Sequence, residues 1–481
     1  MPDSIINRLD ASVTSTSLQS FDAPLAKAFS ESFIGSLISA PFKSISSALQ
    51  AKGGENFARL GTLMQQGAFV AVALMIFSLW LPFFAADKEG LAYISLAALA
   101  MYVLGAMLGG KDKRQFTSID AIVLLFLSIN VVAACASHYF EPSLKGLGKL
   151  VIYTSSYFLF SAVATTPKRR LLLMIAAVSG GFIAASYGLY QFKVGVEPLA
   201  TWEDPTVETK TTRIYSTLGN PNLLAGYLIP FVPLSISMLI AAIVEKKWLY
   251  ALISAPVAGA ILLATVLTAS RGGYIGIVVA LGALFVMLAA WCWPNYPRLR
   301  PVILFLSVIL PLAIVAIVFV VPSVHQRVFS MLQGREHSSN KFRMNVWLAS
   351  LEMFKDNWWI GIGTGNQAFR LAYGLYMKSG FDALGTYCVP LEIAVEAGIL
   401  ALIAFSAFAV AVLGRAHIAF WSKNSGWEKW ICAGMAAAVI GIIAQGFVDT
   451  VFYRPQIHFV FWLLSAALVT AGLSYRKPVE G

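Results

Sequence analysis

Long apolar segments recur along the chain from about residue 67 to about residue 474. Each is about 20 residues long, which is the length that an α-helix needs to cross the hydrocarbon core of a bilayer. Because no water is present there, each segment must satisfy its backbone hydrogen bonds internally, so we expect helices. About twelve spans are predicted, near residues 67–85, 91–110, 118–137, 149–166, 171–190, 222–243, 249–268, 273–293, 301–321, 390–413, 430–448 and 457–474.

Two connections between the predicted spans are long, residues 191–221 and residues 322–389. The second is rich in aromatic residues, and a structureless loop of that length is uncommon within a compact domain. We therefore expect it to contain helices of its own. The sequence predicts an all-α polytopic membrane protein in which a large helical loop precedes the last three spans.

The N-terminal segment, residues 1–66, is polar at first and then amphipathic. Apolar residues recur at helical spacing, at Phe29, Phe33, Leu37 and Ile38. Asp22 and Pro24 are a plausible helix cap and helix start, and Pro41 is expected to kink or end the helix. We predict a cytoplasmic segment whose helix lies on the membrane surface and is a possible site for a protein partner, followed by a membrane domain over residues 67–475.

The composition agrees with a membrane protein, since 58% of the residues are hydrophobic, 12% are charged and the mean hydropathy is +0.73. A soluble domain has roughly 25% charged residues. The formal net charge is +11, but no basic domain with interleaved aromatic residues is present, so we expect no nucleic-acid partner. The cysteines lack CxxC spacing and the histidines lack ligand spacing, so we expect neither a metal nor a cofactor.

Lysine and arginine gather in alternate connections between the spans. They are Lys111, Lys113, Arg114, Lys168, Arg169, Arg170, Lys246, Lys247, Arg298, Arg300, Arg415, Lys423, Lys429, Arg476 and Lys477. Connections rich in these residues stay in the cytoplasm. We therefore expect a protein of the inner (plasma) membrane, surrounded by lipid, with both termini cytoplasmic and both long connections facing outward.

Two arginines go against this rule and are expected on the outer side. Arg213 precedes the Asn220-Pro221-Asn222 sequence, and Arg271 lies in an SRGG sequence between two spans. Proline favours a first helical turn, asparagine caps it, and the first amides of a helix attract anions. Two guanidinium groups beside such a helix start are suited to bind phosphate, carboxylate or bicarbonate.

A structural role for these arginines is the alternative. They would then extend to the lipid headgroups or pair with Glu392, Glu396 or Asp449. The outer connection adds Arg335 and Arg343 to the candidate anion site, and the alternative for these is a solvated or headgroup-touching helix face.

Candidate catalytic residues lie at the start of the next predicted span. Glu392 and Glu396 are four residues apart and so share one helix face close to the outer surface. They would accept a proton from a reacting hydroxyl or neutralise the arginines. The glycine-rich run at residues 358–366 lacks a Walker lysine and GxGxxG spacing, so a tight turn is predicted rather than a nucleotide site.

These motifs, in this order, resemble the O-antigen ligase and Wzy-type polymerase superfamily over roughly residues 120–475: an arginine before GNPN, a second in SRGG, a GIGTGN turn and an LExxxExG helix. The resemblance implies a GT-C-like architecture in which two arginines hold the pyrophosphate of a polyprenyl-linked glycan and an outer histidine activates the acceptor hydroxyl. Arg213 and Arg271 match the arginines. Tyr387 stands where the histidine is expected.

A tyrosine with the ordinary pKa of about 10 is a poor general base at neutral pH. Whether the protein is an enzyme is therefore left open. If it is one, the resemblance implies a metal-independent glycosyltransferase in which Tyr387 or Glu392 assists the transfer.

Other segments are more similar to the cyanobacterial family of proposed bicarbonate transporters linked to inorganic carbon accumulation, a branch of the same superfamily. They are EPLATWED (197–204), RIYSTLGNPNLLAGYLIP (213–230), GREHSSNKFRMNVWLA (334–349), YCVPLEIAVEAG (387–398) and FVDTVFYRPQ (447–456). This resemblance implies bicarbonate transport through an outward-facing arginine site. A glycan ligase or polymerase, and a non-catalytic membrane assembly subunit, are the alternatives.

Overall fold

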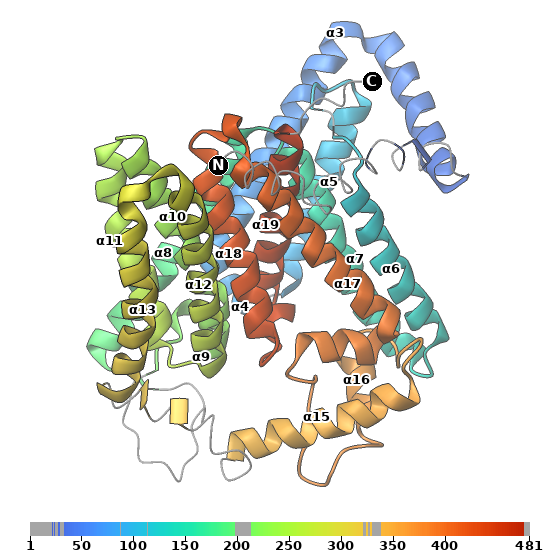
Figure 1. Cartoon of the computed structure of the whole chain (residues 1–481). Coiled ribbons are helices and arrows are strands. Elements are labelled where there is room, and N and C mark those ends of the chain that lie inside the picture. The colour runs from blue at the N-terminus through green and yellow to red at the C-terminus, as the bar shows by residue number, and fades with distance from the viewer. Residues whose placement is uncertain are drawn as a thin grey trace.

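The protein is a bundle of long helices (Figure 1). The structure, a computed structural model, describes residues 22, 24, 27–28, 33–86, 88–112, 114–197, 213–320, 324–325, 328–329 and 338–475. All regular structure in these residues is helical. Within them, eleven segments are long and apolar enough to cross a membrane. The all-α polytopic fold predicted from the apolar windows is therefore confirmed.

The helices that form these spans are α3 (Phe33–Phe77), α5 (Lys88–Met107), α6 (Ser118–Ala136), α8 (Pro167–Val194), α9 (Pro221–Leu228) with α10 (Phe231–Val244), α11 (Trp248–Leu267), α12 (Arg271–Asn295), α13 (Arg300–Val320), α17 (Val389–Trp421), α18 (Glu428–Gly446) and α19 (Pro455–Ser474). The remaining predicted span, residues 149–166, falls in α7 (Phe140–Val163), which is not among these eleven segments.

Helix α7 nevertheless runs from one end of the bundle to the other and makes hydrogen bonds at both ends. At its first turn the Ser143 hydroxyl accepts a hydrogen bond from the amide N–H of Thr364 (2.8 Å), and near its last turn the Ser161 hydroxyl accepts one from Arg114 Nε (2.6 Å). Its serine and threonine side chains are buried against protein, so it can be less apolar than a lipid-facing span.

The long connection before the last three spans contains helices, as predicted. Helices α15 (Ser338–Asp356) and α16 (Asn366–Tyr373) lie across one end of the bundle (Figure 1). We call this end the α15 face and the other end the opposite face. Helices α9, α12, α17 and α19 begin at the α15 face, whereas α6, α8 and α18 begin at the opposite face.

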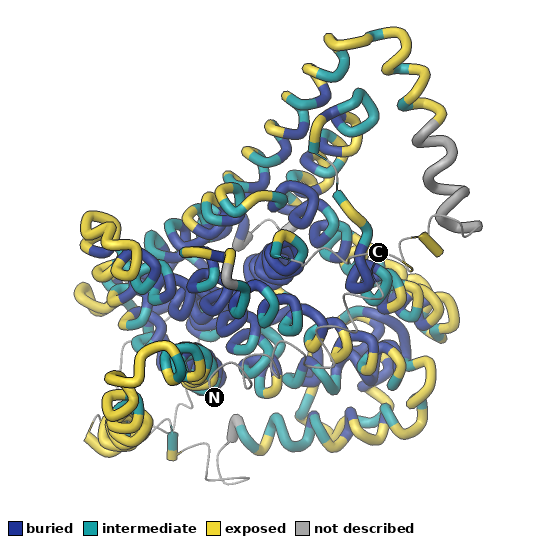
Figure 2. The backbone as a smooth tube through the Cα atoms, turned by 45° about the horizontal axis from the view of Figure 1, so that its top comes forward, coloured by how far each residue is buried: buried dark blue, intermediate teal, exposed yellow. Residues whose placement is uncertain are grey.

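The last two spans lie at the centre of the bundle and form much of its core. The apolar windows of α18 and α19 are 78% and 89% buried, while that of α13 is 0% buried. Figure 2 shows the same gradient, with buried helices at the centre and exposed ones at the rim. Helix α13 therefore presents most of its surface to the surroundings of the bundle.

Helix α3 does not break where the sequence predicted. The expected end at Pro41 is wrong, because the helix continues through Pro41 and its non-helical residue is Gly54 (φ +50°). Glycine reaches this left-handed conformation at little cost, whereas a proline can be accommodated by losing one hydrogen bond.

The predicted glycine-rich turn has a structural role at a break in α17. The break is at Gly398 (φ +77°), where an added Cβ would lie 2.1 Å from the carbonyl oxygen of Trp359. Three backbone hydrogen bonds join the turn to the broken helix: Ile362 N to Val395 O (3.0 Å), Gly363 N to Glu396 O (3.0 Å) and Ile399 N to Trp358 O (2.9 Å). The turn therefore satisfies backbone groups that the break would leave without partners.

Candidate functional site

Arg213 lies in the segment that leads into α9. Asn220 caps α9, as the Asn-Pro-Asn sequence predicts: its Oδ1 accepts hydrogen bonds from the amides of Asn222 (2.8 Å) and Leu223 (3.2 Å). Those two amides are therefore occupied, and the expectation that they remain available to an anion is wrong. Arg213 Nη2 donates to Asn222 Oδ1 (3.1 Å) and its Nε donates to the carbonyl of Thr268 (3.1 Å). Asn222 thus helps to position the arginine, and Asn220 caps the helix that carries Asn222.

Arg271 is the first residue of α12. Its Nη1 donates a hydrogen bond to Asn340 Oδ1 (2.8 Å), which ties α12 to α15. The carbonyl that receives Arg213 belongs to Thr268, only three residues before Arg271. The two segments that carry the arginines are therefore neighbours at the α15 face, as their common sidedness predicted.

A pocket of about 210 Å³ opens between α12, α15 and the end of α18. It is lined by Arg271, Gly272, Ile275, Asn340, Arg343, Met344, Trp347 and Val448. Two guanidinium groups and an amide thus face four apolar side chains. The indole N–H of Trp347 is buried and has no hydrogen-bond partner among the described residues. The pocket therefore combines charged donors with an apolar wall.

Arg343 also faces a buried acid. Its Nη2 lies 3.9 Å from Asp449 Oδ2, which is longer than a hydrogen bond. The guanidinium lies 6.0 Å from the centre of the Tyr387 ring. Burial raises the pKa of Asp449 above its usual value, and Arg343 opposes this shift. Asp449 is thus a carboxylate of increased basicity at the edge of the site.

Tyr387 is held in a strained backbone conformation. Its φ is +57°, and its ring packs edge to face against Phe342 with the ring centres 5.7 Å apart. Burial, and then the charge of Asp449, raise its pKa above the usual value. Tyr387 therefore stays protonated at neutral pH and is suited to donate a hydrogen bond rather than to accept a proton.

Glu392 is engaged in the turn that precedes α17. It is buried, and its Oε2 accepts hydrogen bonds from the amide N–H (3.0 Å) and the hydroxyl (3.3 Å) of Thr386. Neither Glu392 nor Tyr387 lines the pocket. The contacts of Glu392 give it a capping role at this turn.

Several residues other than glycine have a left-handed backbone conformation, with positive φ, and most of them lie near these side chains. Four occur in the described part of the chain, and three of them, Ser216, Ala269 and Tyr387, adjoin the segments of Arg213, Arg271 and the α17 turn. The fourth, Lys246, lies at the opposite face. Such conformations cost about 1–3 kcal/mol each and are frequent at functional sites.

The structure thus assembles part of the predicted site. Arg271 and Arg343 share one pocket, Arg213 lies beside them, and Arg335 lies outside the described residues. Sequence reasoning missed Asn340 as a pocket residue and Asp449 as a candidate base. Asn340 lies three residues before Arg343 and so shares its helix face. This spacing could have predicted from the sequence that both residues face the same pocket.

The structural alternative paired Arg213 or Arg271 with Glu392, Glu396 or Asp449. The ion pair that the structure gives for Asp449 is with Arg343 instead. Among the described residues, no three histidine, cysteine, aspartate or glutamate side chains group as metal ligands.

One comparison with known proteins bears on this site. Residues 256–406 match the family model of O-antigen ligases. The match includes Arg271, α15 and the start of α17, but neither Arg213 nor Asp449. A search of curated proteins finds no match. The many apolar helices are those of a multi-pass membrane protein, and residues 256–406 are similar to the O-antigen ligase family.

Proposed function

We propose that the protein binds a lipid-linked pyrophosphate at the α15 face and transfers the attached glycan to a hydroxyl acceptor, as a ligase or polymerase. The observation that carries this proposal is the pocket between Arg271 and Arg343, which combines two guanidinium groups with an apolar wall. Guanidinium groups bind phosphate oxygens by paired, charge-assisted hydrogen bonds. The apolar side chains would contact the first part of a polyprenyl chain.

The distribution of charge supports an outward orientation of the α15 face. The opposite face carries the connections rich in lysine and arginine, including Arg169, Arg170 and Lys247. Such connections stay in the cytoplasm, so the α15 face would meet a substrate in the outer leaflet of the inner membrane. Both termini would then be cytoplasmic.

The proposed reaction uses the arginines and Asp449 in different roles. The acceptor oxygen forms a bond to the sugar carbon while the bond from that carbon to the pyrophosphate oxygen breaks. Arg271 and Arg343 would stabilise the charge that grows on the leaving pyrophosphate. Asp449 would take the proton of the acceptor hydroxyl, because its raised pKa makes it a stronger base than an exposed aspartate. Tyr387 and Glu392 remain predicted assisting residues, Tyr387 as a hydrogen-bond donor.

A transfer assay tests this proposal. Protein in liposomes is given a lipid-linked glycan and a hydroxyl acceptor, and the product is measured for the wild type and for Arg271→Ala. Loss of a hydrogen bond to a charged group costs about 1.5–3 kcal/mol, so we expect a roughly 10- to 100-fold slower transfer. Arg370→Ala, which removes an exposed arginine at the same face, is the matched control and should transfer normally. Absence of product with native substrates would reject the enzyme.

Bicarbonate transport is the second candidate. It is supported by Tyr387, which occupies the position of the expected histidine and stays protonated, and by the sequence segments similar to the proposed bicarbonate transporters. Arg213 and Arg271 would then bind the anion. A transporter should carry labelled bicarbonate into proteoliposomes and lose this flux in Arg213→Ala and Arg271→Ala. A flux no greater than that of empty liposomes would exclude transport.

A further inference from the structure

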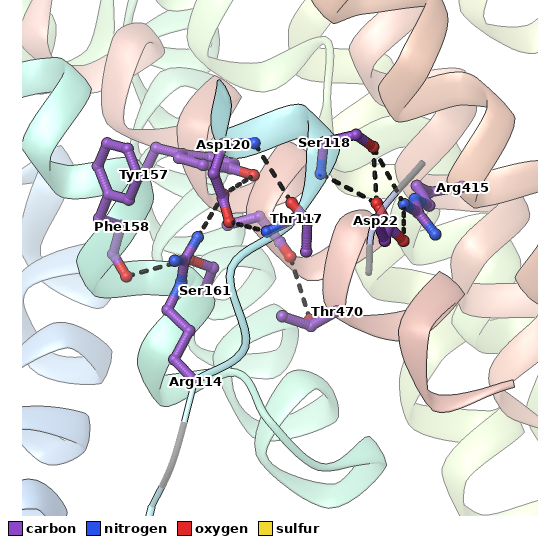
Figure 3. A network of polar contacts seen from close by, with 11 residues as sticks. Asp22, Arg114, Thr117, Ser118, Asp120, Tyr157, Phe158, Ser161, Arg415 and Thr470 are labelled. Atoms are coloured by element: carbon purple, nitrogen blue, oxygen red, sulfur yellow. Dashed lines mark hydrogen bonds and ion pairs between the residues drawn. The ribbon is translucent and has the colours of Figure 1, made fainter. Parts of the chain in front are cut away.

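Asp22 lies at the opposite face, in contact with two residues far from it in the sequence (Figure 3). Its Oδ1 accepts hydrogen bonds from the amide N–H (2.9 Å) and the hydroxyl (2.7 Å) of Ser118. Its Oδ2 accepts a hydrogen bond from Arg415 Nη2. The side chain is almost fully buried. The described contacts of its side chain are with α6 and α17, and the predicted capping of its own helix stays a prediction.

The start of α6 is arranged to receive this carboxylate. Thr117 caps the helix, with its hydroxyl accepting from the amide of Asp120 and its own amide donating to the Asp120 side chain. This reciprocal pair leaves the Ser118 amide to bond Asp22. The partial positive charge at a helix N-terminus favours an anion at this position.

Arg415 is a second, independent feature of the same site. It is 0% exposed, and its Nε and Nη1 atoms have no hydrogen-bond partner among the described residues. In the neighbouring helix, a Cβ added at Gly472 would lie 2.9 Å from both the carbonyl oxygen and the Cβ of Arg415. The absence of a side chain at Gly472 therefore makes room for the arginine. A guanidinium buried in this way requires an anion nearby.

The other buried acids of this face already have basic partners. Asp120 pairs with Arg114 and also accepts a hydrogen bond from Tyr157 (Figure 3). Glu428 forms a two-point pair with Arg170, at the first turns of α18 and α8. The charge of Arg415 is consequently balanced by Asp22.

We propose that Ser118 and Arg415 form a carboxylate-binding site whose occupant is Asp22, so that the chain at Asp22 is held against the bundle through this site. Removing one partner of a buried ion pair leaves an uncompensated buried charge, which is strongly unfavourable. The Nε and Nη1 atoms of Arg415, which have no hydrogen-bond partner among the described residues, can donate to a bound oxyanion. A free carboxylate should therefore fill the site when Asp22 is absent.

Two measurements on the full chain in lipid nanodiscs test this site. Hydrogen exchange of the first turn of α6 reports whether the Ser118 amide is hydrogen-bonded, and tryptic cleavage after Lys27 reports whether the chain is held. In Asp22→Ala we expect exchange to be roughly 10- to 100-fold faster, from the loss of charge-assisted hydrogen bonds, and cleavage to be faster. Added formate should restore the slow exchange but not the slow cleavage, because formate fills the site without a tether.

Matched variants and salts make the test specific. Sodium chloride at the same ionic strength should not restore slow exchange, and Asp10→Ala, which removes another N-terminal carboxylate, should behave as the wild type.

If Asp22→Ala does not fold, Asp22→Asn keeps the shape of the side chain and should show the same changes to a smaller extent. In Asp22→Ala/Arg415→Met, formate should have no effect. Wild-type exchange in Asp22→Ala, or an equal effect of formate and chloride, would overturn the proposal.

Discussion

At the scale of single residues, the properties of the candidate site depend on which charged side chains are buried and which of them lie close together. Arg343 and Asp449 are close enough to influence one another but too far apart for a hydrogen bond, so each keeps hydrogen-bonding capacity for a third group. Tyr387, by contrast, is made less acidic by its surroundings. In the proposed reaction, the arginines would therefore bind the anion and Asp449 would take the proton.

The first prediction concerns this proton. If Asp449 is the general base, transfer requires its ionised form, so the rate should rise with increasing pH through a pKa higher than that of an ordinary aspartate and should fall at lower pH. Asp449→Asn should slow transfer by about 10²- to 10⁴-fold and remove this dependence. Asp382→Asn, which changes an exposed acid at the same face, is the control. An unaltered pH–rate profile in Asp449→Asn would exclude the role.

A second prediction concerns Asn340. Its side chain accepts a hydrogen bond from Arg271 at 2.8 Å and so fixes the arginine at the pocket. Asn340→Ala should weaken binding of a lipid-linked pyrophosphate by about 1.5–3 kcal/mol, the usual value for a hydrogen bond to a charged group. Asn340→Asp, which keeps an acceptor but adds a negative charge, should weaken it further. Equal affinities for all three proteins, measured in nanodiscs, would contradict the positioning role.

At the scale of elements, hydropathy predicted the spans because an apolar window of about 20 residues has few alternatives to a transmembrane helix. The arginines were found because they break the charge rule of the connections. Asn340 and Asp449 were missed because their role depends on how α15 packs against α12 and α18, which no local pattern determines. The break in α17 was missed for the same reason, since it is compensated by a turn more than 30 residues upstream.

The break in α17 gives a third prediction. Gly398 has a positive φ, and a Cβ there would lie 2.1 Å from a carbonyl oxygen. Gly398→Ala should therefore lower the free energy of unfolding by at least about 1–3 kcal/mol and displace the turn that supports the α15 face. Gly282→Ala, in an open position within α12, is the control and should be neutral or slightly stabilising. Thermal unfolding in detergent measures both, and equal stabilities would show that the break is not required.

At the scale of the whole molecule, the account requires that the α15 face and the opposite face lie on different sides of the membrane. The candidate pocket is at one, and the buried ion pairs of Arg114, Arg170 and Arg415 are at the other. The α15 face would then be reached by substrates from outside, and the Asp22 site by cytoplasmic components.

Cysteine labelling gives the fourth prediction. In a variant without the four native cysteines, Lys378→Cys at the α15 face should react with a membrane-impermeant maleimide added to intact cells. Lys247→Cys at the opposite face should react only after the membrane is opened. Both positions are exposed in the structure, so access across the membrane is what differs. Labelling with the opposite sidedness would reverse the proposed orientation.

The central claim is that Arg271 and Arg343 bind the pyrophosphate of a lipid-linked substrate, and native mass spectrometry of the protein with a polyprenyl pyrophosphate tests it most directly. The wild type should bind this lipid much more tightly than the corresponding polyprenol, and Arg271→Ala/Arg343→Ala should lose that preference while Arg370→Ala keeps it. Equal binding of the pyrophosphate lipid and the alcohol by the wild type, or an unchanged preference in the double variant, would contradict the account.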